Sequence, residues 1–279
     1  MTHSNYRPSV VLMGSKPGSV VALEIMCARG WDVRYVVTPQ SIGHPFIAGE
    51  TLSQAAARLG VEVVSSRSLP TDLEVDLVIS YMYRYLVKPR VLRMARLAAL
   101  NFHAGPLPEY GGWAFYNVAI LEDATEYGCT CHYMDEGFDT GPLLEVRRFP
   151  IDAQQETAWS LERRAQIAMI ELFVDVCDQV ESGSPLPREE QDPAHHRYLH
   201  REAFEALKQI PPDADAETID RHARAFWYPP YGLATLALSE TVQVEVIPEI
   251  AKDEIARRLH GDDLTGLRVA AERHVGRSD

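Results

Sequence analysis

The sequence predicts an α/β fold, in which a doubly wound, mostly parallel sheet forms an N-terminal domain and a smaller α+β subdomain follows. Two observations lead to this prediction. Short apolar runs, typical of buried strands, alternate with helical stretches through the first part of the chain. A segment rich in Gly, Pro and acidic residues, 181–193, then resembles a linker to a more aromatic tail. We therefore expect a Rossmann-like domain over residues 1–185 and a smaller C-terminal subdomain over residues 186–279.

The first strand–helix unit is predicted directly after the polar N-terminus. The run Ser-Val-Val-Leu-Met at 9–13 reads as a buried strand, and the turn 14–18 contains two glycines. A helix over 19–29 is expected to follow, because Ser19 can cap its start and Gly30 suits its end. The turn matches neither nucleotide-binding glycine fingerprint, so it is interpreted as a plain strand-to-helix connection.

The remaining elements continue the alternation. From 157 to 181 the apolar residues recur at helical spacing, which predicts a long helix packed on the sheet. In sheets of this kind a ligand binds outside the carboxyl ends of the strands. The other predicted elements are strands at 33–38, 61–64, 76–80, near 101, 233–238 and 242–247, and a helix at 52–59.

Composition and charge limit the kinds of partner. The chain has 279 residues, of which 46% are hydrophobic and 24% charged, as in an ordinary globular protein. No run approaches the ~20 apolar residues that span a bilayer, and no signal peptide precedes the first strand, so we expect a cytoplasmic protein without a membrane partner. The formal net charge of -13 disfavours a nucleic-acid partner, because such partners bind to basic surfaces.

The four cysteines predict neither disulfides nor a metal site. Cys129 and Cys131 lie two apart in a strand-like segment and therefore point to the same face. A metal site would need further ligands at suitable spacing, and none is evident. We expect reduced cysteines that act as small apolar residues.

Two polar segments contain the residues suited to chemistry. Asn101 and His103 alternate about Phe102, so their side chains share one face at a strand's end. Asp139 belongs to a second polar segment, 132–141. Acyl transfer to an amine needs a proton acceptor, a donor for the developing oxyanion and orientation, roles that suit His103, Asn101 and Asp139 respectively. This chemistry needs no metal, although each of these residues is also common in purely structural positions.

These segments resemble the N10-formyltetrahydrofolate-dependent formyltransferases. The family pattern is Asn-x-His, then a Leu-Pro-x-Tyr/Phe-x-Gly loop, then Asp-Glu-Gly-x-Asp-x-Gly, and this chain matches it at 101–112 and 135–141. Between them, 127–133 is similar to the family's Thr-Gly-Val-Thr-x-His segment. The similarity covers roughly residues 10–150. It implies that the catalytic residues are Asn101, His103 and Asp139.

The resemblance also implies where the two substrates bind. The pterin of N10-formyltetrahydrofolate is expected near 80–86 and near the loop 135–139. Lys16, beside the first helix start, is expected to meet an anionic group of a substrate. The residues expected to bind the formyl donor are Tyr81, Met82, Tyr83, Leu86, Asp135 and Glu136, and those expected to bind the acceptor are Gly14, Ser15, Lys16, Tyr110 and Trp113.

Three departures from the family pattern put the acceptor in question. Gly-Pro-Leu-Pro at 105–108 stands where the family has Ser-Leu-Leu-Pro, and Gly111-Gly112 stands where it has Arg-Gly. The tyrosine-rich segment 81–85 replaces a smoother apolar stretch. None of these departures alters the catalytic residues.

The acceptor implied by the resemblance is a nucleotide-linked amino sugar. Residues 217–231 resemble a segment of the tRNA and sugar formyltransferases, and 198–204 resembles enzymes acting on 4-amino-4,6-dideoxy sugars such as GDP-perosamine, in lipopolysaccharide O-antigen synthesis. From Arg201 onward there are ten Lys/Arg and fifteen Asp/Glu, a balance of 10 − 15 = -5, which suits a polyanion poorly. Methionyl-tRNA and other small amines remain alternative acceptors, and a folate- or nucleotide-binding regulator is the non-enzymatic alternative. Relatives that modify sugars suggest a homodimer.

Overall fold

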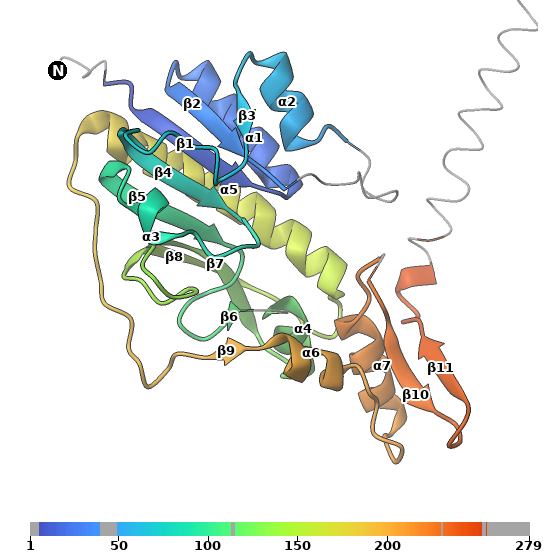
Figure 1. Ribbon diagram of the computed structural model, residues 1–279. Helices are drawn as coiled ribbons and strands as arrows, with labels where there is room; N and C mark the ends of the chain where they lie inside the picture. Colours follow the sequence, from blue (N-terminus) through green and yellow to red (C-terminus); the bar gives the residue numbers. More distant parts are fainter. Residues whose placement is uncertain (1–5, 40–48, 113–114, 230, 253–254, 256–279) are drawn as a thin grey trace, which may run out of the picture.

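The computed structural model describes residues 6–39, 49–112, 115–229, 231–252 and 255 (Figure 1). Its strands are β1 (Ser9–Gly14), β2 (Asp32–Val37), β3 (Val63–Val64), β4 (Val75–Tyr81), β5 (Ala95–His103), β6 (Gly111–Gly112), β7 (Glu126–Tyr133), β8 (Leu143–Pro150), β9 (Tyr198–Leu199), β10 (Ala234–Ala237) and β11 (Gln243–Val246). Its helices are α1 (Pro17–Ala28), α2 (Leu52–Arg58), α3 (Pro89–Leu92), α4 (Phe115–Leu121), α5 (Ala158–Ser182), α6 (Arg201–Leu207) and α7 (Ala216–Ala225).

Seven strands form the central sheet, in the order β3-β2-β1-β4-β5-β7-β8. The strands from β3 to β5 are parallel to one another, whereas β7 and β8 are antiparallel to their neighbours. The long helix α5 runs across this sheet, and the C-terminal elements gather beside α4 at one end of it (Figure 1). The predicted α/β class with a mostly parallel sheet and a smaller C-terminal sheet is confirmed.

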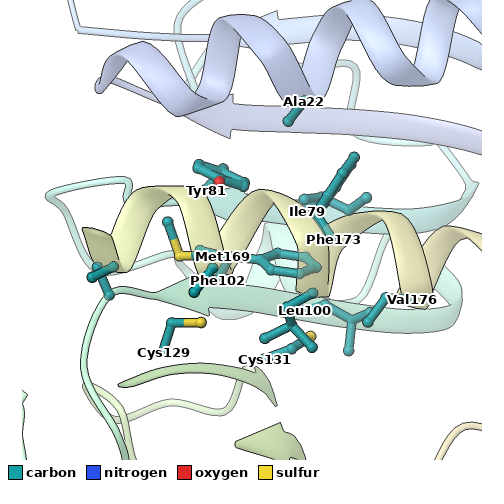
Figure 2. Close-up of a cluster of buried hydrophobic side chains, with 14 of the residues drawn as sticks. Ala22, Ile79, Tyr81, Leu100, Phe102, Cys129, Cys131, Met169, Phe173 and Val176 are labelled. Carbon is teal, nitrogen blue, oxygen red and sulfur yellow. The ribbon is translucent and has the colours of Figure 1, made fainter. Parts of the chain in front are cut away.

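Apolar residues alternate along the central strands between two hydrophobic clusters. In β4, Leu77 and Ile79 point into the larger cluster, and Val78 points into a smaller one on the opposite face. Figure 2 shows the larger cluster, where Phe173 of α5 packs against Phe102 of β5, with ring centroids 5.1 Å apart. All four cysteines are free, and Cys129 and Cys131 lie in this cluster, as the sequence predicted.

The first helix begins two residues earlier than the sequence predicted. Pro17 occupies the start of α1, where its fixed φ suits the helix and its missing N–H leaves no hydrogen bond unmade. The Ser19 hydroxyl therefore does not cap the helix, and it donates instead to the Lys16 carbonyl, 2.6 Å away. Gly30 follows the end of the helix with a φ of 73°, in agreement with the predicted stop.

Buried polar contacts join the C-terminal segment that begins with α7 to the elements before it. Arg224, which is only 4% exposed, donates to the carbonyl of Ala153, and Asn117 of α4 donates to the Ala225 carbonyl at 2.6 Å. The Trp159 amide of α5 donates to the Trp227 carbonyl at 3.1 Å. These contacts place the segment after α7 against α4 and α5, although the division of the chain at residue 185 stays a prediction.

Among the residues that the structure describes, no helix is long and apolar enough to cross a membrane.

Replacement of Phe102 by Ala should destabilise the fold by about 3–5 kcal/mol, because it empties a fully buried site between Tyr81 and Phe173. Urea unfolding of the variant and the wild type measures this difference. Leu97→Ala is the matched control, since Leu97 lies on the same strand but is 50% exposed and should change stability by less than about 0.5 kcal/mol. Similar losses in both variants would contradict this view of the core.

Candidate active site

The three side chains predicted to be catalytic lie together at the carboxyl end of β5. Asn101 and His103 flank the buried Phe102 and so project from one face of the strand. β7 runs antiparallel beside β5, and the loop after it returns Asp139 to the same place. Asp139 Oδ1 lies 3.8 Å from His103 Nδ1 and 3.5 Å from Asn101 Nδ2.

The imidazole of His103 is held in one tautomer. Its Nε2 lies 2.7 Å from the carbonyl oxygen of Tyr110. Because a carbonyl can only accept, Nε2 carries the hydrogen and donates it. The ring is also packed edge-on against Phe115, with centroids 4.6 Å apart. In the neutral form Nδ1, on the side of Asp139, is therefore the atom that is free to take up a proton.

The loop that follows His103 approaches it so closely that residue 105 must be glycine. A Cβ at Gly105 would lie 2.9 Å from both His103 Nε2 and the Tyr110 carbonyl oxygen. Thr130 of β7 anchors the loop, because its hydroxyl accepts from the Leu107 amide at 3.0 Å and donates to the Gly105 carbonyl at 2.8 Å. The departure from the family serine at this position thus agrees with the close packing of the loop.

The second departure from the family pattern, Gly111-Gly112, allows the backbone conformation in which an amide reaches Asp139. β6 pairs in parallel with β9, and a Cβ at Gly111 would lie 2.8 Å from the Arg197 carbonyl oxygen. Gly112 has a φ of 84°, a conformation that favours glycine. This backbone lets the Gly112 amide donate to Asp139 Oδ2 at 3.0 Å.

The backbone of Asp139 is itself strained. Its φ of 56° lies in the left-handed region, at a cost on the order of 1–3 kcal/mol for a residue other than glycine. Gln191 offsets this cost, because its side-chain amide donates to the carbonyls of Asp139 and Gly141 at 2.8 and 2.7 Å. The segment that the sequence suggested as a linker therefore helps to fix the catalytic loop.

The surroundings of Asp139 hold it ionised. Burial alone would raise its pKa, but the charge that His103 carries when protonated, together with His132 and the Gly112 amide, outweighs burial and keeps the pKa well below its ordinary value. The carboxylate is thus ready to stabilise a cation at His103.

His132 is a member of this site that sequence analysis did not select. It lies directly opposite Asn101 in the pairing of β5 with β7 and is 2% exposed. Its Nδ1 lies 2.8 Å from the Tyr133 carbonyl, so Nε2 is left to accept the Asn101 amide hydrogen at 2.9 Å. His132 therefore fixes the orientation of the Asn101 amide. The strand alternation that turns Cys129 and Cys131 inward already implied that His132 faces the other way.

The site opens into a cleft of about 860 Å³. Its walls come from the ends of β1, β4 and β5, from α4 and from the tail. Of the residues predicted from the sequence, those that line it are Ser15, Lys16, Met82, Tyr83, Asn101, His103 and Asp139.

Several predicted binding residues lie elsewhere. Tyr81 is fully buried in the core, because it continues the inward face of β4, and Tyr110 contributes its carbonyl to His103 instead of lining the cleft. Asp135 holds its own turn, with Oδ1 accepting from the Gly137 amide and the Thr140 hydroxyl. Gly14, Leu86 and Glu136 also lie outside the cleft lining, and Trp113 lies outside the described residues.

Lys16 does not stand alone at the helix start. Its Nζ lies 2.8 Å from the Tyr228 hydroxyl and 3.2 Å from Glu162 Oε1, on α5. Glu162 and Tyr228, like Lys16, line the cleft. Sequence analysis selected neither as a site residue, because their proximity depends on how α5 and the tail pack on the sheet.

Within the described part of the chain, no group of three or more His, Cys, Asp and Glu side chains is arranged to hold a metal ion.

Comparison with known proteins matches this chain to enzymes that transfer formyl groups. Residues 49–177 match the family model described as formyl transferase. The methionyl-tRNA formyltransferase of Delftia acidovorans is 31% identical over 255 residues, which cover 84% of this chain and 76% of that protein.

Solved structures share the fold. An N-formyltransferase from Helicobacter canadensis, in complex with folinic acid and dTDP-3-aminofucose, superposes with a TM-score of 0.70 at 20% identity, over 83% of this chain and 84% of that one. A 4-N formyltransferase from Francisella tularensis superposes with a TM-score of 0.69 at 18% identity, over 87% of this chain and 98% of that one.

Asp139→Asn should lower stability by an amount that depends on pH. Because the folded-state pKa of Asp139 lies below the unfolded value of about 3.9, its contribution is present above that pH and is lost as pH falls through the folded-state pKa. Urea unfolding at a series of pH values between about 6 and 2 should therefore show that the wild type exceeds the variant in free energy of unfolding by less and less as the pH falls. Glu136→Gln, an exposed change in the same loop, is the control, and an advantage that stays constant at all pH values would refute the assignment.

Proposed function

The chain belongs to the formyl transferase family, and we propose that it transfers a formyl group from N10-formyltetrahydrofolate to the amino group of a nucleotide-linked amino sugar. The observation that carries this proposal is the position of His103. This residue lines the cleft, and its Nδ1 lies 3.8 Å from the ionised carboxylate of Asp139. An unprotonated nitrogen in that position can take the proton of an attacking amine.

His103 and Asp139 handle the proton. As the amine nitrogen bonds to the formyl carbon, His103 accepts the amine proton at Nδ1 while its Nε2–H stays bonded to the Tyr110 carbonyl. The resulting imidazolium lies next to the Asp139 carboxylate, which stabilises it. When the bond from the formyl carbon to the donor nitrogen breaks, the proton on His103 can pass to that nitrogen.

Asn101 stabilises the oxyanion in this proposal. One hydrogen of its amide is donated to His132 at 2.9 Å, and the same nitrogen lies 3.5 Å from Asp139, the outer limit of a hydrogen bond. The second hydrogen is thus weakly engaged and available to the formyl oxygen as charge develops there.

The formyl donor fits along the loop after β4. Met82 and Tyr83 line the cleft beside Asn101, and the Ser15 hydroxyl donates to the Met82 carbonyl at 3.0 Å, which joins this loop to the end of β1. The folinic acid in the Helicobacter canadensis complex supports a folate donor. Tyr81, Leu86, Asp135 and Glu136 lie outside the cleft lining, so we do not include their side chains in the proposed donor site.

A small acceptor agrees with the charge and the cleft of this chain. The dTDP-3-aminofucose in the Helicobacter canadensis complex supports a sugar acceptor, and the net charge of -13 opposes a polyanion. Aromatic side chains, which pack against sugar or base rings, line the tail side of the cleft: Phe204, Phe226, Tyr228 and Tyr231. We propose a 4-amino-4,6-dideoxy sugar of the GDP-perosamine type, for O-antigen synthesis, as the acceptor.

Methionyl-tRNA is the second candidate acceptor. The observation that favours it is the 31% identity to the Delftia acidovorans enzyme, which exceeds the 18–20% identity to the two solved formyltransferases described above. The acidic charge balance from Arg201 onward weighs against it.

Formyl transfer assayed against a panel of acceptors tests the proposal. With N10-formyltetrahydrofolate as donor, we expect turnover with a dTDP- or GDP-linked 4-amino-4,6-dideoxy sugar and none with methionyl-tRNA, glycinamide ribonucleotide or buffer alone. Transfer to tRNA alone would establish the second candidate. Folate binding without transfer to any amine would support the regulator alternative.

His103→Ala and Asp139→Asn should each lower kcat at least about 100-fold, because one removes the proton acceptor and the other removes the charge that stabilises it. Steady-state kinetics with the acceptor found in the panel measures the effect. Tyr35→Phe, on β2 and away from the cleft, is the control for a general effect of substitution. Near-normal kcat in both variants would eliminate this mechanism but not the fold.

A further inference from the structure

The buried carboxylate of Glu162 connects the start of α1 to the segment that follows α7. Glu162 of α5 is 3% exposed, yet it faces three donors. Lys16 Nζ lies 3.2 Å from its Oε1, Gln166 donates to the same oxygen at 3.1 Å, and the Tyr228 hydroxyl donates to Oε2. Lys16 Nζ also donates to the Tyr228 oxygen at 2.8 Å. We refer to Lys16, Glu162 and Tyr228 as the tail cluster.

The tail cluster is electrically balanced. Lys16 supplies one positive charge and Glu162 one negative charge, and Tyr228 is bonded to both. A phosphate placed against Lys16 would also face the carboxylate, which repels it. The cluster is therefore poorly suited to the anion that the sequence suggested for Lys16, and better suited to holding the tail in place.

The tail cluster fixes the position of two aromatic rings that line the cleft, those of Tyr228 and Tyr231, which we call the aromatic wall. The ring of Tyr228 packs edge-on against Trp159, with centroids 5.8 Å apart, and lies tilted against Tyr231, with centroids 5.1 Å apart. The Lys16 ammonium lies 5.0 Å from the Tyr228 ring and 6.0 Å from the Tyr231 ring. Tyr231 is 56% exposed and lines the cleft, so its ring can receive a ligand.

We propose that Tyr228 determines specificity for the acceptor, because its ring, with that of Tyr231, packs against a ring of the acceptor, while Lys16 and Glu162 act as positioning residues that fix the Tyr228 hydroxyl. The inference rests on the proposed formyl transfer to a nucleotide-linked amino sugar. The ring can belong to the sugar or to the base, since both offer flat faces to an aromatic side chain.

Calorimetric binding without turnover tests this inference. The ligands are GDP-perosamine, a dTDP-linked 4-amino-4,6-dideoxy sugar, dTDP and GDP alone, and folinic acid. Tyr228→Ala should weaken binding of the preferred sugar nucleotide about 10- to 100-fold, and Tyr228→Phe, which retains the ring but not its anchor, should weaken it about 3- to 10-fold. Folinic acid should bind both variants within about twofold of the wild type. If the variants lose equal affinity for the sugar nucleotide and for the free nucleotide, Tyr228 packs against the base. If they lose affinity for the sugar nucleotide alone, Tyr228 packs against the sugar.

The positioning role of Lys16 is tested with steady-state kinetics. Lys16→Met should raise KM for the acceptor about tenfold while kcat and KM for the donor stay within about twofold, since only the acceptor wall moves. Lys252→Met, which removes an exposed lysine paired with Glu249, is the matched control.

Three results would overturn the inference. The first is unchanged sugar-nucleotide binding in both Tyr228 variants. The second is a parallel loss of folinic acid binding, which would mean that Tyr228 is merely structural. The third is no binding of either sugar nucleotide by the wild type. Thermal unfolding identifies variants that fail to fold. If Tyr228→Ala does not fold, the binding data for Tyr228→Phe, the smaller change, are used instead. Failure of formyl transfer itself would be seen separately in the acceptor panel, because these titrations need no turnover.

Discussion

The active site depends on one buried carboxylate, Asp139. An ionised acid away from water needs donors, and this one receives the Gly112 amide and lies beside two histidines and an asparagine. Meeting that need constrains the neighbouring backbone. Residue 112 must adopt a positive φ, residue 139 must adopt the left-handed conformation, and Gln191 must hold the loop from outside. The strain and the two glycines are consequences of keeping that charge in place.

The antiparallel strand β7 is what brings the acid to the histidine. After β5 the chain passes through β6 and α4, and β7 then runs antiparallel to β5, which places His132 directly opposite Asn101. Thr130 on the same strand anchors the loop over His103. One change in strand direction therefore positions the amide donor, the loop and the acid around the proton acceptor.

The tail completes the cleft from the other side. Asn117 and Arg224 tie α7 to the catalytic part through buried backbone carbonyls, and the tail cluster ties Tyr228 to the start of α1. These contacts are polar and directional, so they fix the aromatic wall relative to His103 more closely than apolar packing alone would. In the proposed reaction, β5 and β7 position the residues that handle the proton, and the tail forms one wall of the cleft.

The sequence by itself determined the alternation of strands and helices, the shared face of Asn101 and His103, and the loop that contains Asp139, because strand period and local motifs are properties of neighbouring residues. Sequence analysis assigned Tyr81 to a binding site. The two-residue alternation of the strand, however, places the Tyr81 side chain with Leu77 and Ile79 in the core. Only the tertiary structure could join His132 to Asn101 or Glu162 to Tyr228, which lie 31 and 66 positions apart. Such contacts depend on strand order and helix docking, and no local pattern encodes the partner of a residue that distant.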